Sequence, residues 1–264
     1  MKKVLAVVVL IVMVVACVVG MTACKDGGSD YDYIKNKGTL VCGITLYEPM
    51  NYADEDGEMT GFDTEFAEAV CKKMGIEAKF QVIKWSSKEL ELNAKNIDCI
   101  WNGFTVTEER KENIEFTKSY LSNTQCVVVK AADKANFVSK EYCNGKKAAA
   151  EQGSAGETEA KKMTTEDNYT AVASQMSALT ELVSGTVDFA VMDVVLANSV
   201  VGKGDFSSLA IADAIQLEKE EYAIGFRKGS DMAEKVNAII DELREDGTLQ
   251  ALAEKYGVEN QLIK

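Results

Sequence analysis

The sequence predicts an α/β fold, because short strand-like runs alternate with helix-like segments along most of its 264 residues. The strand-like runs are short, apolar and rich in β-branched side chains. The segments between them repeat apolar side chains every three or four positions, which is the period of an α-helix. With 47% hydrophobic and 27% charged residues, the composition is that of a globular protein. Such alternation is typical of mostly parallel sheets with ligand sites at the carboxyl ends of the strands.

The individual elements follow from local pattern. Strands are expected at residues 40–45, 79–84, 97–101, 125–130, 147–150, 187–192 and 222–226. Helices are expected at residues 64–74, 156–163, 174–184, 194–200, 230–244 and 248–256. In the first of these helices Phe66, Val70 and Met74 share one face, and Gly75 follows as a C-cap.

Charge and composition argue against several classes of function. A formal net charge of −13 argues against nucleic-acid binding, which requires a basic surface. It also argues against electrostatic binding of the protein surface to anionic lipids, so any attachment to the membrane must be a discrete anchor. The chain has no histidine, which removes the commonest general base and metal ligand. Carboxylate or lysine chemistry stays open, but we expect no catalytic residue, no metal and no cofactor.

The N-terminus has the features of an export signal. Lys2 and Lys3 precede an apolar run over residues 4–23, and a polar stretch begins directly afterwards. The sequence Met-Thr-Ala-Cys that ends at Cys24 resembles the bacterial lipobox, in which cleavage falls before a cysteine that is then lipidated. We therefore expect a lipoprotein signal peptide at residues 1–23 and a tether at residues 24–35.

Two alternatives to this N-terminal interpretation stay open. Cys17 ends a similar motif, although more apolar residues follow it instead of a tether. The apolar run is also about long enough to span a bilayer as an uncleaved anchor. All of these interpretations place the folded part outside the cytoplasmic membrane.

Five cysteines follow the proposed anchor, at Cys42, Cys71, Cys99, Cys126 and Cys143. The first three sit in apolar patterns, where a small buried thiol is expected. No pair has metal-ligand spacing, and an odd number cannot all pair within the chain. A disulfide between Cys126 and Cys143 stays open.

An ordered set of motifs follows the tether. The clearest motif is Gly-Phe-Asp-Thr-Glu-Phe at residues 61–66. The other segments of the set are residues 37–41, 96–110, 152–154, 184–193, 222–229, 236–237 and 246–248. Together they resemble one family, the extracellular solute-binding proteins of polar amino-acid ABC importers (bacterial solute-binding protein family 3). The likeness covers nearly everything after the tether, in the same order and at similar spacing.

The resemblance implies a two-lobed fold of the periplasmic-binding-protein type (type II) with a hinged ligand cleft. Lobe one would comprise residues 36–120 plus 223–264, and lobe two residues 121–222. The protein would be an extracytoplasmic, lipid-anchored monomer that binds a free polar amino acid by lobe closure. It would deliver this ligand to the permease and ATPase subunits of an ABC importer.

A free amino acid carries a carboxylate and an ammonium, and desolvating both requires opposite charges and hydrogen bonds. The resemblance assigns the carboxylate to Arg110, whose planar guanidinium can bind it with two parallel hydrogen bonds. Asp193 would pair with the ammonium. Each has a structural alternative: Arg110 as a solvated residue in a helix capped by Thr107, and Asp193 as the N-cap of the next helix.

Neutral donors would complete the carboxylate site. The resemblance places them at Asn102, Gly103 and Thr105 in lobe one, and in the turn Gly153, Ser154 and Ala155 in lobe two. Backbone N–H groups at a helix N-terminus bind anions, which suits this turn because a helix is expected from residue 156. The alternatives are ordinary turn, cap and loop residues.

The remaining site residues would surround the variable part of the ligand. Tyr47 and Trp85 would form aromatic walls, with core packing as the alternative. Glu151 and Met192 would contact the far end, and Glu151 suggests a ligand with a hydrogen-bond donor or a positive charge. Thr45 and Leu46, however, stand where receptors for basic amino acids carry an acid in the first loop, so the identity of the ligand stays open.

Two other functions stay open at this point. Exported dehydratases resemble these receptors, and such an enzyme would need an extra acid or base in the cleft, for which Glu151 is the candidate. A ligand-sensing module without transport is the third hypothesis.

Overall fold

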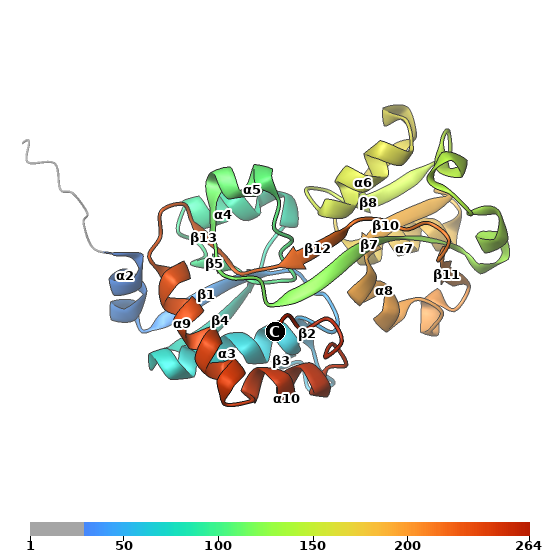
Figure 1. Cartoon of the computed structure of the whole chain (residues 1–264). Helices are drawn as coiled ribbons and strands as arrows, with labels where there is room; N and C mark the ends of the chain where they lie inside the picture. Colours follow the sequence, from blue (N-terminus) through green and yellow to red (C-terminus); the bar gives the residue numbers. More distant parts are fainter. Residues whose placement is uncertain (1–28) are drawn as a thin grey trace, which may run out of the picture.

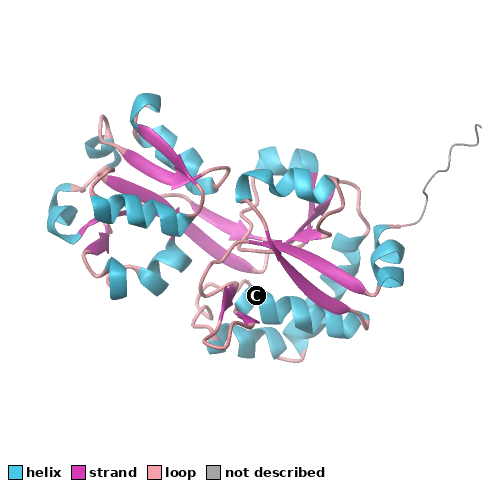
Figure 2. Ribbon diagram, turned by 180° about the vertical axis from the view of Figure 1, so that it is seen from behind, coloured by secondary structure: helices cyan, strands magenta, loops and turns pink. Residues whose placement is uncertain are grey.

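The computed structural model describes residues 29–264. Two bodies lie side by side, each built on its own β-sheet, and extended strands join them (Figures 1 and 2). We call the body with strands β1, β4, β5, β6 and β13 lobe 1, and the body with strands β8 to β11 lobe 2. This arrangement confirms the α/β class and the two-lobed fold.

Lobe 1 is built on a five-stranded sheet. Its strand order is β4 (Glu77–Val82), β1 (Thr39–Ile44), β5 (Cys99–Ile100), β13 (Gly225–Arg227) and β6 (Ile114–Phe116). Strand β1 runs parallel to β4 and β5, whereas β13 is antiparallel to both of its neighbours. The helices of this lobe are α2 (Asp30–Lys37), α3 (Phe62–Met74), α4 (Lys88–Asn93), α5 (Glu108–Asn113), α9 (Met232–Glu245) and α10 (Thr248–Lys255). A small hairpin, β2 (Tyr52–Ala53) and β3 (Met59–Thr60), precedes α3.

Lobe 2 is built on the second sheet. Its order is β11 (Leu209–Ile211), β7 (Leu121–Lys130), β10 (Phe189–Asp193), β8 (Ala148–Glu151) and β9 (Tyr169–Val172). Its helices are α6 (Ala155–Met163), α7 (Gln175–Ser184) and α8 (Val194–Val200). The long strand β7 begins between the lobes and pairs there with β12 (Lys219–Tyr222).

The expected elements are present with shifted ends, apart from two corrections to the sheets. The strand expected at residues 222–226 is divided between β12 and β13, which belong to different sheets. Ala223 donates its N–H to the Phe104 carbonyl, and Ile224 donates to the Thr117 hydroxyl, so the chain leaves one sheet there for the other. The sheets are also mixed, not mostly parallel, because strands that return from the opposite lobe run antiparallel to their neighbours.

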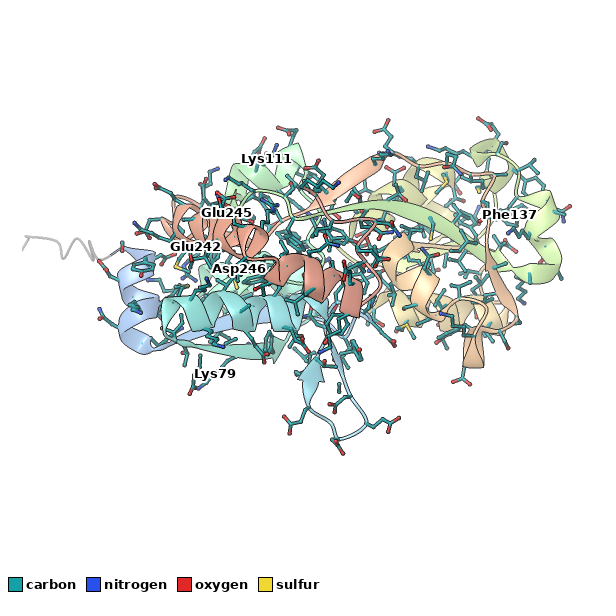
Figure 3. All side chains as sticks on the ribbon, turned by 60° about the horizontal axis from the view of Figure 1, so that its bottom comes forward. Lys79, Lys111, Phe137, Glu242, Glu245 and Asp246 are labelled. Atoms are coloured by element: carbon teal, nitrogen blue, oxygen red, sulfur yellow. The ribbon has the colours of Figure 1, made fainter. Side chains whose placement is uncertain are left out.

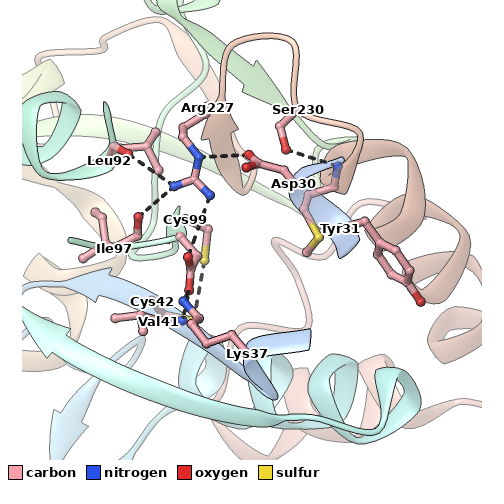
Figure 4. Close-up of polar contacts among 12 residues, drawn as sticks. Asp30, Tyr31, Lys37, Val41, Cys42, Leu92, Ile97, Cys99, Arg227 and Ser230 are labelled. Carbon is pink, nitrogen blue, oxygen red and sulfur yellow. Dashed lines mark hydrogen bonds and ion pairs between the residues drawn. The ribbon is translucent and has the colours of Figure 1, made fainter. Parts of the chain in front are cut away.

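The segment expected as a tether differs from the expectation in its second half, which forms helix α2. Ser29 caps this helix by accepting a hydrogen bond from the Asp32 N–H. Ile34 is fully buried, and Asp30 forms a 2.9 Å ion pair with Arg227 (Figure 4). The signal peptide at residues 1–23 and the lipidation site Cys24 lie outside the described residues.

The five cysteines after residue 29 are all buried free thiols. Burial of Cys42, Cys71 and Cys99 confirms their expected place in the core. Cys42 and Cys99 are register neighbours on β1 and β5, with their sulfur atoms 3.6 Å apart (Figure 4). Cys126 lies in a different hydrophobic cluster from Cys143, and the two are not bonded.

The surface carries the acidic excess of the composition. Glu242, Glu245 and Asp246 project from the end of α9 on the outside of lobe 1 (Figure 3).

Between residues 29 and 264, every helix falls short of the length and apolarity that a bilayer crossing demands.

Candidate functional site

A small cavity lies between the lobes, where the carboxyl ends of β1, β5, β8 and β10 face each other. It is lined by Thr45, Tyr47, Trp85, Asn102, Gly103, Thr105, Arg110, Glu151, Ser154, Ala155, Gln175 and Asp193. Every residue expected to bind ligand is in this set except Gly153 and Met192. The free space is about 10 Å³, which is roughly the room that one water molecule needs. The lobes are therefore closed on each other.

Arg110 turns into the cleft and not into solvent. Thr107 caps helix α5 as expected, accepting from the Arg110 N–H at 3.1 Å. The guanidinium lies over the Phe104 ring, donates to the Thr105 carbonyl at 2.6 Å and reaches the Gly153 carbonyl of lobe 2 at 3.2 Å. Burial lowers the pKa of Arg110, and Glu220 and Asp193 oppose that shift. Arg110 thus donates hydrogen bonds to backbone carbonyl oxygens of both lobes.

The neutral donors expected in lobe 1 are engaged within the protein. Asn102 accepts from the Thr45 N–H and hydroxyl and donates to the Thr45 carbonyl. Gly103, at φ 55°, donates its N–H to Asp63 at 2.7 Å, and a Cβ there would meet the Tyr47 ring. These two residues shape the floor of the cavity with their own hydrogen bonds satisfied.

Thr105 is engaged as well, with an acid that sequence inspection overlooked. Its hydroxyl donates to Glu220 Oε1 at 3.1 Å. Glu220 comes from β12, in the strand pair that connects the lobes. A ligand carboxylate would therefore compete with Glu220 for this hydroxyl.

The turn before α6 presents its carbonyl and its helix end to lobe 1. Ser154 is the N-cap of α6 and accepts from the Glu157 N–H at 3.0 Å. Gly153 lies just outside the cavity, and its N–H donates to Glu157. Its carbonyl accepts from Arg110 and, at 2.9 Å, from Lys88. Ala155, the first residue of α6, lines the cavity directly.

Asp193 ends β10 inside a dense set of donors. Its carboxylate accepts from Asn123 at 2.7 Å, Gln125 at 2.7 Å, Tyr222 at 2.8 Å and also Gln175. It stands at the N-cap position of α8, but its side chain makes no capping hydrogen bond. Burial raises the pKa of Asp193, and the four donors oppose that shift. The Asp193 carboxylate therefore makes its hydrogen bonds in the cleft and does not cap the helix.

Tyr47 and Trp85 line the cavity and also pack in the buried hydrophobic clusters of lobe 1. Tyr47 shares a 2.8 Å hydrogen bond with the Tyr222 hydroxyl. Trp85 packs edge to face on Phe104, and the Lys88 ammonium lies 4.9 Å from its ring centre. These rings close the lobe 1 side of the cavity.

Glu151 and Met192 lie in different surroundings, the first in the cavity and the second in the core. Glu151 is 3% exposed and lines the cavity, and its Oε1 has no hydrogen-bond partner among the described residues. Burial, and secondarily Asp193, raise the pKa of Glu151 to about 8, while Lys88 opposes them. Met192 packs in the hydrophobic core and not in the cavity, because side chains alternate along β10 and Asp193 takes the inward position. A contact between Met192 and the ligand stays a prediction.

Several polar residues at the site were not predicted. Thr45 and Gln175 line the cavity, and Lys88 and Glu220 line the wider groove beside it. Asn123 and Gln125 lie two positions apart on β7, so they share a face, and both are buried. Nothing in the sequence indicates this burial, because residues 122–125 of the strand are all polar.

The comparisons with known proteins agree on one family. The sequence profile of the bacterial extracellular solute-binding proteins, family 3, matches residues 40–259. The L-cystine-binding protein TcyJ of Escherichia coli is 30% identical, over 93% of this chain and 92% of that protein. The arginine-binding extracellular protein ArtP of Bacillus subtilis is also 30% identical, over 94% and 96% respectively.

A solved structure agrees with this result. It is the substrate-binding protein of an ABC uptake transporter from Streptococcus pneumoniae, with bound histidine. It superposes with a TM-score of 0.82 and 29% sequence identity, covering 90% of this chain and all of that one.

Proposed function

The chain belongs to family 3 of the bacterial extracellular solute-binding proteins, and from this we propose that it binds a free polar amino acid for an ABC-type importer. One observation carries the proposal. Arg110 of lobe 1 and Asp193 of lobe 2 line the same cavity from opposite sides. A zwitterion needs one cation for its carboxylate and one anion for its ammonium, and the cost of desolvating it is compensated only when both are present.

We propose that the lobes close on the ligand, with boundaries at residues 36–120 plus 223–264 and at 121–222. Strands β7 and β12 pair between the lobes, which makes them candidates for the hinge. The ligand carboxylate would replace the Gly153 carbonyl as a partner of Arg110, because a carboxylate is the stronger acceptor. Both charges are met only in the closed form, so the ligand favours that form.

For the ligand we propose a cationic or polar side chain that faces Glu151. The free oxygen of this buried carboxyl supports the proposal, since a buried acceptor without a partner is unfavourable until a donor reaches it. Two ligands named for similar proteins, arginine and histidine, carry such donors. The cystine named for TcyJ carries a second ammonium group, which would serve equally well.

We further propose that the protein acts as an extracytoplasmic monomer attached to the membrane through a lipidated Cys24. The basic start, the apolar run and the motif ending at Cys24 support this proposal. A permease and an ATPase would be the partners of the closed form. A gene for a permease next to the gene for this chain would favour transport over sensing.

A thermal-shift screen against the amino acids tests the function directly. A ligand that binds only the folded state raises its stability with ln(1 + [L]/Kd), so melting temperature should climb with ligand concentration. We expect such a shift with L-arginine, L-histidine or L-cystine, and a much smaller one at the same concentration with Arg110→Ala. A flat response to all amino acids would remove the basis of the proposal.

We propose that the protein is not an enzyme, and Glu151 makes this testable. A carboxyl with a pKa near 8 holds a proton at neutral pH and has the protonation state of a general acid. Under our proposal a bound amino acid is recovered unchanged after long incubation, as measured by mass spectrometry. Turnover that depends on Glu151 would instead favour the dehydratase-like alternative.

A further inference from the structure

Glu220 occupies a position that the sequence did not reveal. It lies on β12, in the strand pair between the lobes, and lines the groove that shares Arg110, Ser154 and Ala155 with the ligand cavity. Its neighbour Glu221 is exposed. A second acid at the mouth of the site is unexpected next to the buried carboxylate of Asp193.

The two acids share the same donors. Asn123 Nδ2 and Gln125 Nε2 each donate both to Asp193 Oδ1 and to Glu220 Oε1, over distances of 2.5–2.7 Å. Each amide uses one hydrogen for each acid, which sets the two carboxylates face to face across them. When both carboxylates are ionised they repel each other, and the repulsion is strong because little solvent reaches the site to screen it.

Glu220 has one carboxylate oxygen without a donor among the described residues. Glu220 Oε1 also accepts from Thr105, a residue of the cavity wall, whereas no described residue donates to Oε2. Asp193 has donors on both of its oxygens. Of the two acids, Glu220 therefore has the greater unused capacity to accept from an ammonium group.

From this geometry we infer that Glu220 is a second acid of the ammonium site, paired with Asp193. The pair shares one proton while the cleft is empty and releases it to solvent when the ligand ammonium binds between them. This inference rests on the proposed function, since it assumes a ligand that carries an ammonium group. The exchange is balanced, because one cation enters the site as one proton leaves it.

The titration of the groups around the pair agrees with it. Burial, and next the charge of Asp193, raise the pKa of Glu220 to about 7, against the usual 4.5. The charged and titratable groups that face the pair are Arg110, Tyr47, Tyr222, Glu151 and Cys126. Glu151 also titrates in this range, so the effect of Glu220 must be read as a difference between variants.

Isothermal titration calorimetry in phosphate and in imidazole buffer at about pH 6 counts the protons released on binding. The probe is L-arginine or L-cystine, whichever binds the wild type more tightly. We expect the wild type to release up to about one proton more than Glu220→Gln. Below pH 7, each unit of falling pH should lower the affinity of the wild type by up to about tenfold more than that of Glu220→Gln. Glu221→Gln, one residue along the same strand, should match the wild type in both.

Two further variants keep the test decisive. Glu220→Asp keeps the second acid, so it should still release the proton although it binds more weakly. Asp193→Asn removes the like charge beside Glu220 and should reduce the extra proton release, while burial keeps part of it. Equal proton counts and pH slopes in wild type and Glu220→Gln, with ligand bound by both, would overturn the pairing but leave the receptor function intact. A wild type that binds neither probe would overturn both.

Discussion

Arg110 shows how one side chain serves both the closed structure and the proposed ligand. Its two terminal nitrogens reach carbonyls on different lobes, Thr105 in lobe 1 and Gly153 in lobe 2. Its flat face rests on Phe104, which fixes the plane of the guanidinium. A carboxylate arriving in that plane can take two parallel hydrogen bonds without moving the arginine far.

Arg110→Ala should therefore weaken amino-acid binding by roughly 2–5 kcal/mol, because it leaves a desolvated carboxylate without a charge partner. Arg110→Lys should recover only part of the loss, since an ammonium cannot make the paired contact. Calorimetric titration of the three proteins measures both effects. Wild-type affinity in Arg110→Ala would show that the carboxylate binds elsewhere.

Glu151 should leave a mark on stability as a function of pH. Its pKa is raised from 4.5 to about 8, so between these values the folded state holds a proton that the unfolded state has lost. Stability is therefore highest below pH 4.5 as far as this group is concerned, and falls as pH rises through the window by at most about 1.4 kcal/mol per pH unit.

Glu151→Gln removes this titration, so the variant should gain stability relative to the wild type as pH rises from about 5.5 to 8.5. Urea unfolding at three pH values measures the difference. The same variant should lose affinity most for a ligand with a cationic side chain. A constant stability difference across the pH range would mean that Glu151 is ionised in the folded state.

At the scale of residues, the sequence located the cavity but not its hydrogen bonds. Motif resemblance named Arg110, Glu151 and Asp193, which line the cavity, because each has a fixed place in an ordered pattern. It could not show that Thr105 donates to Glu220, because their contact joins residues 115 positions apart. Met192 packs in the core beside Asp193, because one step along a strand reverses the direction of the side chain.

At the scale of elements, long amphipathic helices were predictable and strand partners were not. Helix α3 carries an apolar stripe and a Gly75 cap that identify it locally. The break between β12 and β13 has no local sign, because Tyr222, Ala223 and Ile224 are all buried and apolar in pattern. Only the partner strands, in two different sheets, divide that run.

Helix α2 is held on lobe 1 by a buried ionic cluster. Arg227 pairs with Asp30 at 2.9 Å and with the fully buried Asp98 at 3.7 Å, and it donates to the Leu92 and Ile97 carbonyls (Figure 4). Arg227→Ala should destabilise the fold by roughly 3–5 kcal/mol, because it leaves a buried carboxylate with one cation fewer. Urea unfolding measures this loss.

The neighbouring residue provides the control for this cluster. Lys228 is 54% exposed, and Lys228→Ala should change stability little. Both variants should bind ligand as the wild type does at temperatures where they are folded. Equal stability of Arg227→Ala and wild type would show that the cluster contributes nothing net.

The N-terminal segment gives a prediction of its own. The mature protein should begin at a diacylglyceryl-modified Cys24, because the motif before it matches a lipoprotein cleavage site. Intact mass spectrometry of protein from the membrane fraction of its native host measures this directly. Cys24→Ala should accumulate unprocessed with unchanged ligand affinity, since the described residues that line the cavity begin at Thr45 in the sequence. Retention of residues 1–23 would contradict the prediction.

At the scale of the whole molecule, the closed cavity sets a requirement for motion. Space for about one water cannot admit an amino acid, so the lobes must part before a ligand enters. Away from strands β7 and β12, the hydrogen bonds between the lobes include those from Lys88 and Arg110 to the Gly153 carbonyl and from Ser199 to the Glu48 carbonyl. Each contributes about 0.5–1.5 kcal/mol, or up to about 3 when charged, so these bonds alone do not hold the empty protein closed.

Ligand binding should then shift the population back toward closure, because Arg110 and Asp193 meet the ligand together only in the closed form. The radius of gyration from small-angle X-ray scattering should fall when a saturating amino acid is added. Asp193→Asn should fold normally but bind more weakly and compact only at higher ligand concentration, since the ammonium loses one of its acids. An unchanged radius of gyration with ligand bound, confirmed by calorimetry on the same sample, would reject lobe closure while leaving the binding site in place.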